Sequence, residues 1–303
     1  MGISRQTLEQ WKRRGDDGQC QHTYEVMCDL LKRYCADIIN VDSDRVFLQG
    51  SYANHTNIKD NSDIDIVVMH KTVFGNNARE VLNESQLREF NVKYSDSDLT
   101  INSFKEQIYE RLNGKYFDGK YIILEKGCKT IKFNQDNTHW SLVPVDFVPA
   151  LEYRYYHKNN GINKDNQTEG IKIYDTCKNE HHINYPKLHK KNGEEKNQPN
   201  RTAGYYKETI RVFKRIRTHL IELKVIAEEL VPSYGLECML YNVPDSFFRL
   251  DIVERIPRII NWFSNNINDK FEEQNGMYYL FRKSWNIQDS KIFIDKCIWL
   301  FNN

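Results

Sequence analysis

Residues 49–68 read QGSYANHTNIKDNSDIDIVV, and they place two acidic residues at the start of an apolar run. The run from Ile64 onward is rich in β-branched residues and follows a polar loop, which predicts a strand. Asp63 and Asp65 are two positions apart, so their carboxylates point to the same face of that strand. Two like charges this close repel each other, and a divalent cation would remove that cost. The stretch therefore predicts a cation site at the start of a buried strand.

Two further features accompany the acidic pair. A short apolar run at 45–49 predicts a strand that ends at Gly50 and Ser51, where a flexible backbone and a hydroxyl can meet a phosphate. Asp146 lies inside another strand-like run, VPVDFV. A solvated turn ahead of an ordinary strand is the alternative interpretation of an isolated Asp-x-Asp pair. Three carboxylates beside a Gly-Ser turn favour instead a phosphoryl-transfer site with two Mg²⁺ ions, for which Mn²⁺ is a possible substitute.

The 303 residues predict about two domains at roughly 150 residues each. Helical periodicity predicts helices at 4–13, 21–39, 100–113, 201–231, 234–240, 246–268 and 289–301. Strands are expected at 45–49, 64–69, 121–124, 130–133 and 142–148. The polar stretch from His189 to Pro199 is the expected boundary. We therefore expect an α+β lobe over residues 1–190 and a helical lobe over residues 200–303.

Composition excludes several classes of protein. The chain is 40% hydrophobic and carries 43 Lys and Arg against 42 Asp and Glu, which argues against collagen-like, coiled-coil and wholly disordered chains. No apolar stretch approaches the ~18 residues of a membrane span, and the amino terminus lacks a signal pattern. We therefore expect a cytoplasmic protein with no membrane partner.

The number and spacing of the cysteines also agree with a cytoplasmic protein. The seven cysteines include no Cys-x-x-Cys pair, so we expect neither a disulfide framework nor a zinc ribbon. One local group, Cys177 with His181, His182 and His189, has zinc-ligand chemistry. The lack of a second cysteine in that group disfavours a zinc site there.

The motifs resemble a known family. Gly-Ser, Asp-x-Asp and a later Asp on a strand are similar to the polymerase-β-like nucleotidyltransferases. The segments Arg211–Ile216 and Pro232–Glu237 extend the resemblance to the cGAS/DncV-like nucleotidyltransferases of bacterial antiphage (CBASS) defence, in the branch called clade E. The resemblance implies a bilobal polymerase-β-like fold, with a mixed-sheet lobe and a C-terminal helical lobe.

The resemblance also implies roles for individual residues. Asp63 and Asp65 would bind both Mg²⁺ ions, and Asp146 would bind the one nearer the attacking hydroxyl and favour its deprotonation. The implied nucleotide-binding residues are Gln49, Gly50, Ser51, Asn184, Lys214, Ser233 and Tyr234.

Among these, Ser51 and the Gly50 backbone would hold the triphosphate, while Lys214 and Ser233 would contact phosphates. Tyr234 would stack on a nucleobase, and Asn184 would read a base edge because an amide both donates and accepts. Each has an alternative: Lys214 as a solvated surface charge, Tyr234 as a core residue, and Asn184 as a turn residue.

The implied activity is the synthesis of a cyclic dinucleotide second messenger from ATP, GTP or UTP, which then activates an effector protein. The region 187–217 supports an anionic ligand, since it holds ten Lys and Arg against three Glu. It has few aromatic residues, which favours small nucleotides over a nucleic-acid activator. The alternatives are a nucleotidyltransferase acting on a protein, a small molecule or an RNA end, and a non-catalytic nucleotide- or RNA-binding module. The bases and the linkage stay open.

Overall fold

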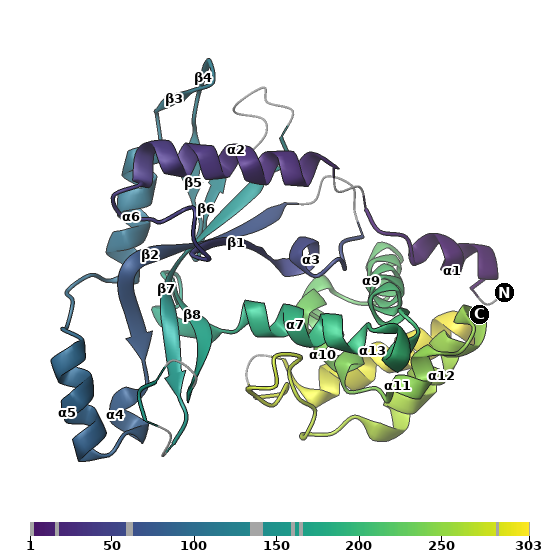
Figure 1. Ribbon diagram of the computed structural model, residues 1–303. Helices are drawn as coiled ribbons and strands as arrows, with labels where there is room; N and C mark the ends of the chain where they lie inside the picture. The colour runs from purple at the N-terminus through teal and green to yellow at the C-terminus, as the bar shows by residue number, and fades with distance from the viewer. Residues whose placement is uncertain are drawn as a thin grey trace. The chain divides into compact units, whose positions relative to one another are not determined.

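The chain divides into two compact units (Figure 1). The computed structural model describes residues 3–15, 18–58, 63–133, 142–158, 161–163, 166–282 and 285–302. The sheet unit comprises residues 16–52 and 61–187, and the helical unit comprises residues 1–15, 53–60 and 188–303. The N-terminal segment therefore joins the helical unit instead of the α+β lobe expected over residues 1–190. The cause is apolar burial, because Leu8 is part of the helical unit's core.

The sheet unit is built around one mixed sheet. Its strands are β1 (Val46–Gln49), β2 (Ile64–Asn76), β5 (Leu124–Lys126), β6 (Ile131–Phe133), β7 (Val145–Tyr156), β8 (Gln167–Asp175) and β9 (Glu180–Asn184). The order is β1-β2-β7-β6-β5, with β8 also paired to β7 and β9 paired to β8. Strands β2 and β7 run parallel, and the other pairs are antiparallel. A small hairpin, β3 (Tyr116–Phe117) and β4 (Lys120–Tyr121), stands apart from this sheet.

Successive side chains along the central strands point alternately to the two faces of the sheet, and both faces carry apolar clusters. Ile64, Ile66 and Val68 face a core that includes apolar residues of α2 (Gly18–Cys35) and α6 (Ile101–Leu112). These two helices cover that face (Figure 1). Val67 and Val148 point the other way, into a second apolar cluster. The helices α3 (Gly50–Ala53), α4 (Ala78–Val81) and α5 (Glu84–Lys93) complete the elements around the sheet.

The helical unit is held by one large apolar core, to which Phe213, Ile256 and Phe293 each contribute a fully buried side chain. Its helices are α1 (Arg5–Trp11), α7 (Pro186–Lys196, whose first two residues belong to the sheet unit), α8 (Pro199–Thr202), α9 (Tyr206–Glu222), the 3₁₀ turn η3 (Glu228–Leu230), α10 (Ser233–Tyr241), α11 (Asp245–Phe248), α12 (Ile252–Asn266) and α13 (Ile287–Asn302). Among the described residues, no helix combines the length and the apolar character that crossing a membrane requires.

The fold class is confirmed, while several expected boundaries were wrong. The helical unit begins again at Leu188, next to the expected boundary stretch from His189 to Pro199. That stretch is not irregular but lies largely in α7, because buried His189 and Lys196 anchor one side of this polar helix. The expected helix 201–231 ends at Glu222, and Lys224 follows with a positive φ of 57°. The expected strand 121–124 is divided between β4 and β5. Strand β7 continues to Tyr156, because its second half pairs with β8.

Candidate active site

Polar side chains line up across four strands at one end of the sheet. The backbone register places Gln49 opposite Asp65, Asp65 opposite Asp146, and Asp146 opposite Lys132. Residues opposite each other in a ladder project from the same face. We call Gln49, Asp65, Asp146 and Lys132 the polar row. Because Val67 and Val148 lie two residues further along β2 and β7, the row lies on the face opposite α2 and α6.

Gly50 lies directly against the carboxylate of Asp65. Its φ is +71°, a conformation that favours glycine, and a Cβ added there would come within 2.4 Å of Asp65 Oδ2. Ser51 follows as the second residue of α3 and is half-buried. The turn between β1 and α3 therefore brings its backbone to the polar row.

Gly50→Ala is expected to reduce activity through its contact with Asp65. Gly114 is a matched control, because its φ is +72° and a Cβ added there meets nothing within 4 Å. Both alanine variants should lose about 1 kcal/mol of stability from the strained backbone. Only Gly50→Ala should also displace the Asp65 carboxylate, and it should lower the catalytic rate by up to about a hundredfold. Equal rates for the two variants would show that the close approach has no role.

Sequence reasoning missed two partners of Asp146. The Thr130 hydroxyl hydrogen-bonds the Asp146 carboxylate, and Lys132 lies opposite it in the ladder. Both come from the segment that ends in β6, where Ile131 and Phe133 are buried and the polar residues alternate with them. That alternation is visible in the sequence. The pairing of β6 with β7 is not visible there, so the two residues could not be assigned to the site.

The carboxylates crowd one another electrostatically. Burial, followed by the charges of Asp146 and Asp63, raises the pKa of Asp65 to about 7. Burial also raises the pKa of Asp146, against the opposing charge of Lys132. Asp63 is exposed, next to the start of β2. Asp65 and Asp146 are adjacent in the strand register, and carboxylate oxygens are the donors that suit a hard divalent cation.

The pKa of Asp65 predicts how stability changes with pH in metal-free protein. A carboxyl whose pKa is higher in the folded than in the unfolded state binds more protons when the protein is folded. Its contribution to the free energy of unfolding therefore falls as the pH rises from about 4 through 7. Relative to the Asp65→Asn variant, the wild type should lose about 2 kcal/mol of its free energy of unfolding between pH 5.5 and pH 8.0. Urea unfolding in chelator measures this difference. Asp96→Asn, at an exposed loop position, serves as control, and parallel curves for wild type and Asp65→Asn would contradict the expectation.

Asn184 shares the face of the polar row. It is the last residue of β9 and lies opposite Ile171, whose side chain joins the apolar cluster of Val67 and Val148. Its side chain is exposed. Gly170 permits the close approach of the chain here, since a Cβ on it would come within 2.8 Å of the Asn184 carbonyl oxygen.

Lys214 lies in the interior of the helical unit, where it is 5% exposed. Its ammonium donates to Glu237 Oε1 at 2.5 Å and to the Thr56 hydroxyl at 3.2 Å. His189 Nε2 lies 3.1 Å from the other Glu237 oxygen. Burial by itself raises the pKa of Glu237, but Lys214 and His189 outweigh it and hold this pKa well below its usual range. Lys214 is therefore neither a solvated charge nor unpaired, and Glu237, which the motif contained, is its partner.

Ser233 and Tyr234 open α10, and both side chains are exposed. One face of the Tyr234 ring stacks on His189, with ring centroids 5.2 Å apart. The Tyr234 hydroxyl donates to Glu273 Oε2 at 2.9 Å. The ring is thus held in position while 46% of the residue remains exposed, so it is not a core residue.

The basic excess over 187–217 does not form a face of unpaired cations. Lys196 and Arg201 both pair with Asp245, and Lys190 with Glu194. The Arg217 guanidinium donates to backbone carbonyls. The charge count therefore overstated the cationic surface, because acidic partners from outside the counted region were not included in it.

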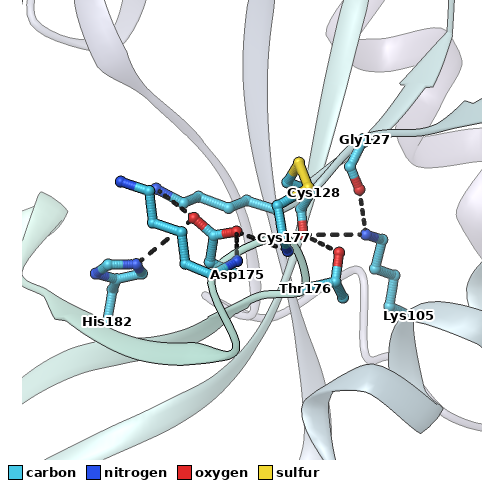
Figure 2. The surroundings of a disulfide bond; sticks show 9 residues. Lys105, Gly127, Cys128, Asp175, Thr176, Cys177 and His182 are labelled. Atoms are coloured by element: carbon cyan, nitrogen blue, oxygen red, sulfur yellow. Dashed lines mark hydrogen bonds and ion pairs between the residues drawn. A yellow bond between two sulfur atoms is a disulfide. The ribbon is translucent and has the colours of Figure 1, made fainter.

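A disulfide joins Cys128 to Cys177 across 49 residues, contrary to the expectation from cysteine spacing (Figure 2). The Thr176 backbone N–H and hydroxyl donate to the Cys128 carbonyl at 3.1 and 3.0 Å, and Lys105 donates to the carbonyls of Gly127 and Cys128. The sheet brings two distant turns together, which spacing along the chain could not reveal. The suggested zinc group does not form, because Cys177 is bonded to Cys128 and His189 bonds Glu237 in the helical unit.

Removing this disulfide should destabilise the protein. Closing a loop of this length restricts the unfolded chain and typically contributes about 2–4 kcal/mol. Cys128→Ser should lower the free energy of unfolding by that amount, and dithiothreitol should lower the wild-type melting temperature while leaving the variant unchanged. Cys28→Ser, at a free cysteine, should keep the response to reductant. A wild type that is insensitive to reductant would contradict the expectation.

Comparison with known proteins agrees with this geometry. Residues 28–160 match the nucleotidyltransferase domain, and residues 191–302 match the cGAS/DncV-like nucleotidyltransferase C-terminal helical domain. The chain is 36% identical to the cyclic UMP-AMP synthase of Rhodothermus marinus, with 97% of this chain and 96% of that protein covered. It is 28% identical to a cyclic dipurine nucleotide synthase of Elizabethkingia meningoseptica, with 98% of each covered.

Solved structures give the same result. The Rhodothermus marinus CdnE c-UMP-AMP synthase with Apcpp and Upnpp superposes with a TM-score of 0.81 at 35% identity, covering 98% of this chain and 96% of that one. The Elizabethkingia meningoseptica CdnE cyclic dinucleotide synthase with GTP and Apcpp superposes with a TM-score of 0.72 at 26% identity, covering 97% of each. Both halves of the sequence and the fold agree, and the chain belongs to the cGAS/DncV-like nucleotidyltransferases.

Proposed function

We propose that this protein is a cyclic dinucleotide synthase that joins two NTPs and releases pyrophosphate. The observation that carries the proposal is the register of β2 on β7, which sets Asp65 opposite Asp146 beside the Gly50 turn. Relatives that align over nearly the whole chain support cyclic products. A non-cyclising transferase would use the same carboxylates, so the product decides between the two.

The reaction is two displacements at phosphorus. In each, a ribose hydroxyl oxygen forms a bond to the α-phosphorus of an NTP, and the bond from that phosphorus to the β-bridging oxygen breaks. Pyrophosphate leaves, and the hydroxyl proton is lost to solvent or a nearby base. The first round links two nucleotides, and the second closes the ring. Catalysis of this kind depends on positioning and on neutralising charge.

The carboxylates of Asp63, Asp65 and Asp146 would hold two Mg²⁺ ions, with Mn²⁺ as a possible substitute. When bound, the ions neutralise triphosphate charge and lower the pKa of a coordinated hydroxyl. The chain's own contribution is the fixed geometry: adjacent strands hold Asp65 and Asp146 side by side, and Thr130 orients the Asp146 carboxylate. The raised pKa of Asp65 means that metal binding competes with a proton near neutral pH.

Gln49, Gly50 and Ser51 are proposed to contact the triphosphate, which their turn beside the polar row supports. Asn184 is proposed to read a base edge, supported by its exposure on the same face. In the helical unit, the exposed Ser233 and Tyr234 are proposed to contact phosphate and base. Lys214 was expected to contact phosphate. Its burial against Glu237 favours a positioning role instead: Glu237 also contacts His189, and His189 stacks on Tyr234.

The biological role is proposed by family likeness. The product would act as a second messenger in the cytoplasm, where NTPs are available, and would activate an effector protein in antiphage signalling. The relatives are named for different products, among them UMP-AMP and dipurine rings, so the family alone does not choose the bases.

The test supplies all four NTPs with Mg²⁺ and no acceptor. A cyclic dinucleotide has no terminal phosphate, so it should survive phosphatase, and mass spectrometry then gives its bases. Asp63→Asn combined with Asp65→Asn should yield no product while its circular dichroism spectrum stays unchanged. Phosphatase-sensitive linear products would favour a non-cyclising transferase. Nucleotide or RNA binding without turnover would favour a binding module.

A further inference from the structure

A charged cavity of about 300 Å³ lies at the opposite end of β7 from the polar row. Arg45, Glu152 and Arg154 line it, together with Tyr94 and Gln167. Glu152 is six residues beyond Asp146 on β7, which corresponds to roughly 20 Å at about 3.3 Å per residue. The cavity is therefore separate from the candidate active site.

Two arginines share one carboxylate in this cavity. Arg45 Nη2 lies 2.8 Å from Glu152 Oε2, and Arg154 binds the same carboxylate through Nε at 2.9 Å and Nη2 at 3.0 Å. The Arg154 guanidinium is also held 3.7 Å above the centre of the Phe74 ring. One negative charge therefore faces two largely buried and fixed positive charges.

Arg45 retains an unused donor. Its Nη1 is buried and has no hydrogen-bond partner among the residues that the structure describes. A buried donor without an acceptor is destabilising, and an acceptor supplied by a bound molecule would remove that cost. The other carboxylates that line the cavity do not accept a hydrogen bond from Arg45 Nη1. Asp44 and Glu169 pair instead with Lys187, at 3.0 and 2.7 Å.

We propose that this cavity binds a small organic oxyanion, a phosphate or a carboxylate, through Arg45 and Arg154. Guanidinium groups bind the oxygens of either group well, and because Glu152 occupies the Nε–Nη2 edge of Arg154, the unpartnered Nη1 of Arg45 would make the first contact. The cavity is larger than the anionic group alone, and the Tyr94 and Ile162 side chains in its wall would contact the body of the molecule. Lys93, also in the wall, adds a third cation. The proposal does not depend on the proposed catalytic function.

Thermal unfolding of the full chain in chelator tests the proposal, with inorganic phosphate and succinate as the two probes and sodium chloride at matched ionic strength. At least one probe should raise the melting temperature saturably, and which one does so identifies the anionic group. Arg45→Lys keeps the positive charge but removes the forked guanidinium, and it should raise the apparent Kd at least tenfold. Arg79→Lys, at an exposed position of α4, should not change it.

Lys93→Gln provides a second variant should Arg45→Lys fold poorly, because the Lys93 side chain is exposed. The Lys93→Gln substitution should raise the apparent Kd severalfold. The proposal is overturned if neither probe shifts the melting temperature beyond sodium chloride. It is also overturned if a folded Arg45→Lys variant, or Lys93→Gln in its place, binds as tightly as the wild type.

Discussion

Asp65→Asn is expected to lower the rate of cyclic dinucleotide synthesis by at least about a thousandfold, because the proposed metal site would contribute several kcal/mol to the transition state and Asp65 is one of its three proposed ligands. The substitution keeps the shape of the side chain and removes its charge. Asp65 lies between Gln49 and Asp146 in the register, and Asp146 has its own proposed role, so it is not expected to replace the lost charge. Pyrophosphate release from NTPs measures the rate.

The Asp65→Asn protein should remain folded. Removing a crowded carboxylate relieves repulsion from Asp63 and Asp146, so its stability at pH 8 in chelator should equal or exceed that of the wild type. Asp96→Asn should keep full activity. A folded Asp65→Asn enzyme within tenfold of the wild-type rate would contradict the assignment.

Glu237→Gln is expected to destabilise the protein by about 3–5 kcal/mol, because it leaves the buried Lys214 ammonium without its counter-charge. Both side chains are about 5% exposed, so water cannot replace the lost partner. His189 would also lose a carboxylate partner. Urea unfolding gives the change in free energy.

Two further variants isolate this ion pair. Glu222→Gln changes an exposed glutamate at the end of α9 and should cost less than about 0.5 kcal/mol. Combining Glu237→Gln with Lys214→Met removes both charges, and it should recover most of the lost stability. A loss in Glu237→Gln that is no larger than that in Glu222→Gln would show that the pair contributes little.

The parts of the site that follow from local pattern were predictable from sequence. Alternation set Asp63 and Asp65 on one face, and the apolar run around Asp146 marked a strand. The parallel pairing of β2 with β7 was not predictable, and it is this pairing that makes Asp65 and Asp146 neighbours. Thr130 and Lys132 were missed for the same reason, since strand order is a property of the whole sheet.

Long-range pairing also explains the errors elsewhere. The partner of Lys214 lies 23 residues away on another helix, and that of Cys128 lies 49 residues away across the sheet. Neither distance has a periodic signature in the sequence. The polar composition of 189–199 indicated a boundary, and the helical unit does begin again at Leu188, but the contacts of His189 and Lys196 that stabilise a helix there were not visible in the sequence. Local propensity is a weak guide where buried polar contacts decide the structure.

The most direct test of the central claim counts divalent ions. Electron paramagnetic resonance of Mn²⁺ with a non-hydrolysable NTP measures how many ions each chain binds. We expect two for the wild type, and loss of at least one in Asp146→Asn with the nucleotide still bound. An unchanged count in Asp146→Asn and in Asp65→Asn would contradict the claim that the carboxylates of β2 and β7 jointly hold the metals.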